Sequence, residues 1–332
     1  MAVQYPCPSC GASLAYDIDS GRMLCEHCGT SCEVMDVAGK GDGEDYKVYH
    51  CNSCGAEMIT DDNTAATICA FCATPNLMEA RLEGKWKPTR LIPFRISREK
   101  AKELFRSWTR KGIFTPNAFR SQSMLDGVVG MYIPFWLYDI NAEVRINANC
   151  TKIHKRTWGD WIETITEHYD VYREVKSSFD KIPADASTRM PDSAMDALEP
   201  YQQENLQTFY MPYLAGFQAD KYDLDASELE ARVKDKVQKS VIQEAMGTIS
   251  GYSTTRVANQ EIRMDTHDEE YVLLPVWMLT YRYKDKAYTL AMNGQTGKLI
   301  GALPASRMKM AAWFAGMSAA LFGVFILIGG LV

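Results

Sequence analysis

Eight cysteines near the N-terminus form two copies of one metal-binding pattern. In each copy a CxxC pair is followed after fourteen residues by a second CxxC pair, and the ligand sets are Cys7, Cys10, Cys25 and Cys28, then Cys51, Cys54, Cys69 and Cys72. The two thiolates of a CxxC turn converge on one ion, so each copy supplies the closed tetrahedral set of a structural zinc site. The sequence therefore predicts two Zn²⁺ sites in two zinc ribbons, with no coordination position open for catalysis.

Two other interpretations use the same cysteines. Two disulfide-bonded loops would require an oxidising compartment, which no other sequence feature supports. A rubredoxin-like iron site uses similar turns, but that fold needs a longer insert and an aromatic core around the metal. Of the two remaining cysteines, Cys32 is expected to be a buried thiol of the first ribbon or a spare ligand, and Cys150 a core residue of a strand.

No catalytic set is recognisable outside the ribbons. His154, His168 and His267 lack the spacing of metal ligands or of a catalytic triad. The segment Gly294–Lys298 has two residues between its glycines, whereas a phosphate-binding loop has four. We therefore favour a non-catalytic protein over an enzyme.

Sequence periodicity predicts an α+β fold for the region after the ribbons. Ser97 is expected to cap a helix that ends near Lys111, and a capping box at Ser227–Glu230 is expected to start a long helix with one apolar stripe. Strand-like segments are expected at 128–148, 161–175, 272–283, 287–292 and 298–300. Together they predict an antiparallel sheet that packs against helices.

Two apolar motifs in these strands are similar to each other. Tyr132-Ile-Pro-Phe-Trp-Leu and Leu274-Pro-Val-Trp-Met-Leu share a proline two residues before a tryptophan, and each motif follows a predicted helix. The similarity predicts a duplicated helix-plus-sheet unit, with chance similarity between short apolar strands as the alternative. The expected domains are the first zinc ribbon (1–37), the second zinc ribbon (45–80), an α+β domain (88–304) and a C-terminal transmembrane helix (311–332).

The C-terminal segment from Ala311 to Val332 contains 22 residues and no charge. At about 1.5 Å per residue, a helix of this length spans the roughly 30 Å hydrocarbon core of a bilayer. Arg307 and Lys309 precede the segment, so the positive-inside rule places the rest of the chain in the cytosol. We expect a tail-anchored, single-pass protein of the inner membrane that contacts the lipid bilayer through residues 311–332.

Charge is strongly segregated along this chain of 332 residues and net charge −6. Residues 1–80 hold three basic and twelve acidic residues, and residues 81–120 hold twelve basic and three acidic residues. These opposite charges predict that the ribbons dock against the basic helix around Arg98, Lys102 and Arg106, in reach of Glu57 or Asp61. The alternative is two solvated surfaces that never meet.

Several motifs resemble those of one bacterial family over essentially the whole chain. They are the Cys-Pro-Ser-Cys-Gly turn, Leu91-Ile-Pro-Phe94, the two proline–tryptophan motifs, Met292–Lys298 and the apolar C-terminal segment. The family is that of the transcription-factor-IIB-type zinc-ribbon-containing proteins. The resemblance implies zinc and this architecture, and it implies no activity.

Three functional hypotheses follow. The first is a membrane-anchored, non-catalytic adaptor whose ribbons and α+β domain bind a protein partner. The second is nucleic-acid binding, which an acidic ribbon region disfavours because Lys and Arg must neutralise phosphates. The third is an enzyme built in the α+β domain.

Overall fold

The computed structural model describes residues 5–38, 46–61, 69–72, 77–80, 88–117, 122–283 and 286–329. Within the predicted ranges, residues 1–4, 39–45, 62–68, 73–76, 81–87, 118–121, 284–285 and 330–332 lie outside the described residues. The fold is α+β, with a large sheet and several helices.

The chain forms two compact units. Unit 1 comprises Met1–Pro134, Ser187–Lys221 and Leu273–Val332, and unit 2 comprises Phe135–Ala186 and Tyr222–Val272. These units differ from the expected domains, because unit 1 contains both ribbon regions and the expected 88–304 domain is divided between the two units.

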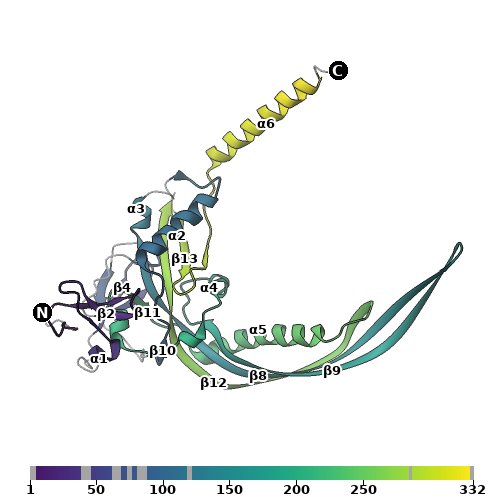
Figure 1. Cartoon of the computed structure of the whole chain (residues 1–332), viewed down its shortest axis with the longest axis horizontal. Helices are drawn as coiled ribbons and strands as arrows, with labels where there is room; N and C mark the ends of the chain where they lie inside the picture. Colours follow the sequence, from purple (N-terminus) through teal and green to yellow (C-terminus); the bar gives the residue numbers. More distant parts are fainter. Residues whose placement is uncertain are drawn as a thin grey trace. The chain divides into compact units, whose positions relative to one another are not determined.

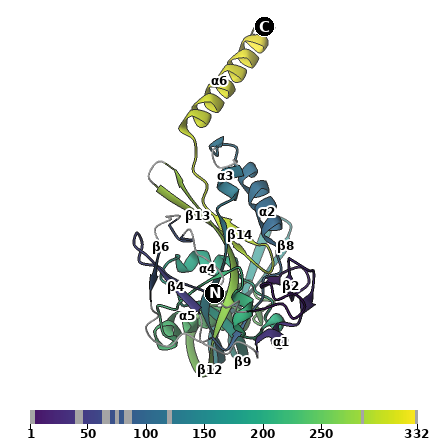
Figure 2. The same ribbon diagram turned by 90° about the vertical axis from the view of Figure 1, so that its left-hand side faces the viewer.

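The first ribbon has a small sheet of its own. Its strands pair in the order β1-β2-β3 and are followed by a short helix; the elements are β1 (Leu14–Asp17), β2 (Arg22–Cys25), β3 (Ser31–Cys32) and α1 (Val34–Ala38). Figure 2 shows β2 and α1 close together in this region. Met23 is fully buried and Leu14 pairs with Cys25, so the sheet places one ligand directly opposite a core residue.

The second ribbon belongs to a larger sheet. The main order of that sheet is β10-β7-β12-β8-β11-β5-β4-β6, with β9 on β8, β13 on β12 and β14 on β13. The strands are β4 (Tyr46–Cys51), β5 (Glu57–Asp61), β6 (Leu77–Ala80), β7 (Arg90–Leu91), β8 (Val128–Trp158), β9 (Trp161–Asp185), β10 (Gln207–Thr208), β11 (Gln218–Asp220), β12 (Thr254–Tyr283), β13 (Lys286–Asn293) and β14 (Leu299–Gly301). The second ribbon enters this sheet through β5, which pairs antiparallel with β11.

The starts of two helices confirm one prediction and correct another. The helical elements are α2 (Arg98–Lys111), α3 (Gln122–Leu125), α4 (Asp192–Leu198), η2 (Gln203–Asn205), η3 (Met211–Leu214), α5 (Ala226–Gly247) and α6 (Arg307–Gly329). Ser97 caps α2 as predicted, because its side chain accepts a hydrogen bond from the backbone N–H of Lys100. The capping box of α5 is formed by Asp225 and Glu228, two residues before the predicted pair.

Unit 1 has an aromatic core. Phe94 stacks on Phe217 at 4.5 Å between ring centroids and contacts Trp277 at 4.9 Å. The Phe94 ring also fills the space beside Gly294, where an added Cβ would lie 2.7 Å from the ring. A side chain at position 294 would therefore displace the ring.

Unit 2 is a curved ribbon of strands that packs on one helix. Figure 1 shows β8 and β9 running side by side with α5 alongside them. The predicted stripe of α5 is confirmed, since its apolar residues are buried against Val144 and Ile146 of β8; they are Leu229, Val233, Val237 and Val241. Cys150 is buried in the same core, as expected.

The two proline–tryptophan motifs occupy equivalent positions. In unit 1 the Trp277 indole N–H donates to the Ile96 carbonyl oxygen at 2.8 Å, one residue before the N-cap of α2. In unit 2 the Trp136 indole N–H donates to the Leu224 carbonyl oxygen at 3.0 Å, one residue before the N-cap of α5. The duplication of a helix-plus-sheet unit stays a prediction, and this matched geometry supports it.

The structure corrects the prediction of a membrane anchor. In the described part of the chain no helix is long and apolar enough to cross a membrane. The transmembrane helix at 311–332, the tail anchor and the single-pass localisation in the inner membrane were therefore wrong predictions. Residues 330–332 of the expected segment lie outside the described residues, and the described helix α6 is Arg307–Gly329. The helix also starts earlier, so Lys309 lies in its first turn, where its Nζ donates to the Thr115 carbonyl oxygen at 2.7 Å.

The basic helix has partners other than the predicted ones. Lys102 lies 3.5 Å from a carboxylate oxygen of Asp126, and the Arg98 guanidinium donates to the Asp126 carbonyl oxygen. Glu57 lies 3.7 Å from the Lys221 ammonium. Lys102 and Glu57 thus each form an ion pair with a residue other than the predicted one.

Candidate metal centres

The structure brings the eight predicted cysteines together in two groups of four. Within each group the Sγ atoms all lie within 4.8 Å of one another. Two Sγ–Sγ distances in the first group are 3.5 Å for Cys7–Cys28 and 3.6 Å for Cys10–Cys25. In the second group they are 3.6 Å for Cys51–Cys72 and 3.7 Å for Cys54–Cys69. Each group could therefore hold one metal ion.

These distances fit a tetrahedral ion better than a disulfide bond. A Zn–S bond of about 2.3 Å in a tetrahedron places the sulfur atoms about 3.8 Å apart. A disulfide requires sulfur atoms about 2.05 Å apart, and no disulfide bond joins any of the ten cysteines, all of which the structure describes. The interpretation as two disulfide-bonded loops is thus not supported by the geometry.

The turns between the cysteines share one backbone geometry. In three of the four CxxC turns the residue after the second cysteine is a glycine with a φ between 73° and 75°, at Gly11, Gly29 and Gly55. Its N–H donates to the carbonyl oxygen of the first cysteine at 2.8–2.9 Å. Only glycine adopts this φ without steric cost, so the glycine lets the chain reverse directly behind the second thiol.

Burial alternates along each ligand set. The first cysteine of every CxxC pair is buried, and the four are Cys7, Cys25, Cys51 and Cys69. The second cysteines are exposed or half-buried. Each group therefore lies at the edge of a small core, with one side towards solvent. Cys32 is half-buried and does not belong to either group.

The thiols of the first group differ in proton affinity when no ion neutralises them. Burial raises the pKa of Cys7, but hydrogen bonds from the backbone of Cys10 and Ser9 and from Cys28 outweigh it and lower that pKa to about 6. A backbone hydrogen bond from Ala12 lowers the pKa of Cys10, but its contacts with Cys28 and Cys25 and its burial raise that pKa to about 12. Binding of an ion by all four sulfurs therefore releases protons.

The residues around the first group come from the same ribbon. The backbone N–H of Ser9 donates to the Cys7 sulfur at 3.4 Å. The Thr30 hydroxyl lies 3.2 Å from the Cys28 sulfur and donates to the Ser9 hydroxyl at 3.0 Å. Tyr16 of the first ribbon contacts the rest of unit 1, since its ring meets the Tyr213 ring edge-on at 5.2 Å.

The residues around the second group come from distant parts of unit 1. The Thr280 hydroxyl of β12 donates to the Ala70 carbonyl oxygen at 2.7 Å, inside the Cys69–Cys72 turn. The Arg189 guanidinium lies over the Phe71 ring at 6.0 Å from its centroid. Strand β5 follows the Cys51–Cys54 turn and pairs with β11, where Met58 lies opposite Asp220.

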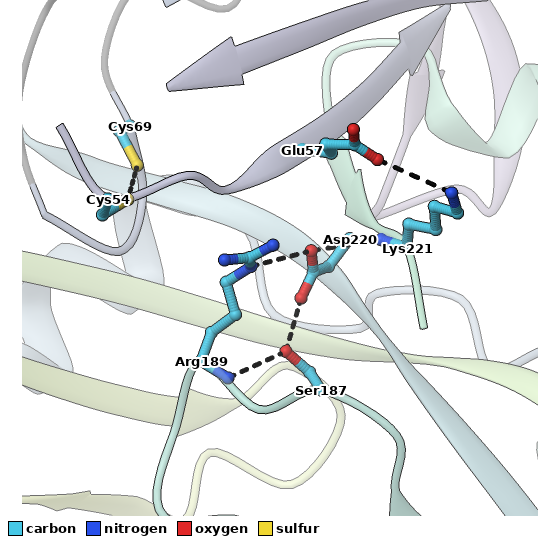
Figure 3. A network of polar contacts seen from close by, with 7 residues as sticks. All are labelled: Cys54, Glu57, Cys69, Ser187, Arg189, Asp220 and Lys221. Carbon is cyan, nitrogen blue, oxygen red and sulfur yellow. Dashed lines mark hydrogen bonds and ion pairs between the residues drawn. The ribbon is translucent and has the colours of Figure 1, made fainter. Parts of the chain in front are cut away.

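A buried carboxylate lies at the centre of this attachment (Figure 3). Asp220 is fully buried, and its carboxylate accepts hydrogen bonds from the Ser187 hydroxyl at 2.6 Å and from the Lys221 backbone N–H at 3.1 Å. The Arg189 Nε lies 3.9 Å from the same carboxylate. Arg189 thus joins the buried Asp220 to the turn that carries Cys69 and Cys72.

Sequence reasoning did not find these supporting residues. Ser187, Arg189, Asp220 and Thr280 lie more than one hundred residues after Cys72, and no local motif marks them. Asp220 and Thr280 meet the second ribbon because β11 and β12 belong to the same sheet as β5.

The comparisons with known proteins identify a relative of similar length. No family model matches the chain, and no solved structure matches it. The chain is 44% identical over 327 residues to YdjG of Bacillus subtilis (strain 168), which is described as an uncharacterized protein. The alignment covers 97% of this chain and 96% of that protein. The chain belongs to the YdjG family. The resemblance to transcription-factor-IIB-type proteins is not confirmed by these comparisons and stays a prediction.

Proposed function

We propose that this protein is a non-catalytic zinc-ribbon scaffold that holds two structural Zn²⁺ ions and binds a protein partner through unit 1. The observation that carries the proposal is the spacing of the sulfur atoms. In each group two pairs of sulfur atoms lie 3.5–3.7 Å apart, which matches the edges of a zinc–sulfur tetrahedron. Four protein ligands leave no position for a substrate or for a reactive water.

Metal analysis tests the zinc proposal. Protein purified without added metal should contain close to two zinc per chain, and Cys7→Ser and Cys51→Ser should each reduce this number to one. Iron coordinated by four thiolates would be visible as a coloured protein. A metal content near zero, or iron in place of zinc, would contradict the proposal.

The partner is proposed to bind beside the first ribbon. An open pocket of about 410 Å³ lies there within unit 1, and the β1–β2 turn forms one wall. Aromatic and apolar residues line it together with polar ones, and its members are Tyr16, Ile18, Asp19, Ser20, Gly21, Pro93, Phe94, Arg95, Asn205 and Gln207. Such a mixture of apolar and polar groups is typical of sites that bind protein side chains. The net charge of −9 over residues 1–80 supports a protein rather than a nucleic acid as the partner.

Site-specific cross-linking tests the partner. A photoreactive residue at Asp19 of the full chain should form an adduct with one discrete protein in cells. Arg95→Glu should abolish the adduct because it places a second negative charge in a pocket that already contains Asp19. A photoreactive residue at Met35, an exposed residue outside the pocket, is the matched control. Adducts with nucleic acid, or equal adducts from both positions, would contradict the proposal.

A further inference from the structure

Strand β9 has an outer edge that no strand of the described chain covers. It pairs with β8 alone, although it is 25 residues long. An uncovered edge presents a row of backbone N–H and C=O groups that can pair with another strand. Natural proteins usually protect such an edge by shortening it, by a bulge or by proline. From Trp161 to Phe179 the register with β8 is unbroken, and the first irregularity follows near Lys181.

The two faces of β9 differ in a regular way. Odd-numbered residues in the second half of the strand, such as Val171, Val175 and Phe179, pack towards the core that contains α5. The even-numbered residues from Ile162 to Asp180 are all exposed. A strand that paired with the outer edge of β9 would have to place its apolar residues on the same face as the odd-numbered residues of β9.

The charges of β9 are arranged in two halves. Residues 160–170 contain four acidic residues and no lysine or arginine. Residues 171–183 contain three basic and two acidic residues. An antiparallel partner with the same sequence would place the acidic half of each strand beside the basic half of the other.

We propose that β9 pairs antiparallel with β9 of a second copy of this chain, about a two-fold axis at Asp170. A two-fold axis perpendicular to the sheet keeps both α5 helices on the same face. At such an axis one residue lies directly opposite its own copy in the other chain. Asp170 is the midpoint of the unbroken stretch from Trp161 to Phe179, so this register uses the whole stretch.

The side chains that meet in this register are complementary. On the α5 face, Glu167 of each copy lies opposite Arg173 of the other, and Ile165 lies opposite Val175. Trp161, which is 82% exposed in one copy, lies opposite Phe179. Opposite charges and aromatic pairs at directly facing positions stabilise a sheet. A shift by two residues in either direction would place Arg173 opposite Ile165 or Tyr169 and remove the ion pair.

One contact opposes the pairing. The two Asp170 carboxylates face each other at the axis, and like charges at directly opposite positions destabilise a sheet. The dimer is therefore weakened by its own central residue, and removing that charge strengthens it. This consequence is specific to the register and distinguishes it from association through any other surface.

Sedimentation of the full zinc-bound chain over a concentration series tests the pairing. The chain should show a monomer–dimer equilibrium, and Asp170→Asn should lower the dissociation constant about tenfold. Glu167→Arg and Arg173→Glu should each weaken the dimer, and the double variant should restore it because the ion pair is re-formed with reversed sign. A chain that stays monomeric up to about 100 μM, as expected if β9 instead pairs with a strand of another protein, would overturn the proposal.

Cysteine cross-linking tests the register. Facing Cα atoms in an antiparallel pair lie about 4.5–5.5 Å apart, within the range that a disulfide spans. With oxidised glutathione, Asp170→Cys should give a covalent dimer linked through position 170. The matched control is Thr164→Cys. In this register the two copies of position 164 lie twelve residues apart along the strands, a distance of about 40 Å. Equal cross-linking of both variants, or a dimer that Asp170→Asn leaves unchanged, would overturn the proposal.

Discussion

The two ribbons have the same four-cysteine ligand set but different attachments to unit 1. The first ribbon folds as a separate three-stranded sheet, and Ser9 and Thr30, which lie next to its sulfur atoms, belong to the ribbon itself. The second ribbon is part of the large sheet, and Thr280 and Arg189 hold its second turn from distant segments.

The same four-cysteine motif therefore has a different structural role in each ribbon. In the first ribbon the ion would stabilise a local fold, because the strands of this ribbon pair with one another in a sheet of their own. In the second ribbon the ion would stabilise the β5 edge at which β11 pairs, and thereby part of unit 1. The folding free energy gained from metal binding is therefore local in one case and shared in the other.

The largest expected effect comes from removing one ligand of each ribbon at matched positions. Cys51→Ser should lower the free energy of unfolding of unit 1 by more than about 4 kcal/mol, as is typical when a structural metal is lost. Cys7→Ser should unfold the first ribbon and leave β11 intact. Hydrogen exchange at Gln218–Asp220 measures the difference, with fast exchange in Cys51→Ser and protection in Cys7→Ser. Equal loss of protection in both variants would show that the ribbons are attached alike.

A smaller effect is expected from the buried carboxylate. Asp220→Ala removes the acceptor of the Ser187 hydroxyl and the carboxylate beside Arg189, and breaking such a buried pair costs about 3 kcal/mol. The matched change in the first ribbon is Asp17→Ala. The exposed carboxylate of Asp17 accepts hydrogen bonds from the Ser20 hydroxyl and N–H. This change should cost less than about 1 kcal/mol.

Hydrogen exchange of the zinc-bound chain again gives the measurement. Asp220→Ala should speed exchange in β5 and β11, whereas Asp17→Ala should affect only the β1–β2 turn. If Asp220→Ala leaves the exchange of β5 unchanged, the carboxylate does not attach the second ribbon to the sheet.

The metal centres could be predicted from sequence because their signal is local. Two cysteines separated by two residues must converge, and the glycine that follows marks the turn, so spacing alone gives the ligand set. The α2 cap at Ser97 and the apolar stripe of α5 were found for the same reason, since each depends on residues within a few positions of one another.

The attachment of the second ribbon could not be predicted because its signal is not local. Asp220 and Thr280 look like ordinary strand residues until β11 and β12 are placed in the sheet. The strands themselves were predicted too short: β8 extends ten residues beyond the expected end at Ala148, to Trp158. Its last residues are mostly exposed on both faces, so the alternation of apolar and polar residues on which the prediction relied is absent there.

The smallest expected effect concerns single hydroxyl groups beside the two ion sites. Thr280→Val removes the hydrogen bond to the Ala70 carbonyl oxygen, a net loss of about 1 kcal/mol. Thr30→Val removes the exposed hydroxyl beside the Cys28 sulfur, which should cost less because water can replace it. Both changes loosen a cysteine turn, and the loss of a group that orients a metal ligand lowers metal affinity about 10-fold to 100-fold.

Transfer of zinc to a coloured chelator distinguishes the two sites. We expect two phases, a fast one from the first ribbon and a slow one from the second, because the second turn is held by β12 as well as by its own residues. Thr280→Val should accelerate the slow phase alone, and Thr30→Val the fast phase alone. Both sites have four sulfur ligands, so a difference in rate must come from the residues around them. A single phase, or two variants that change the same phase, would mean that these surrounding residues do not set the rate of zinc release.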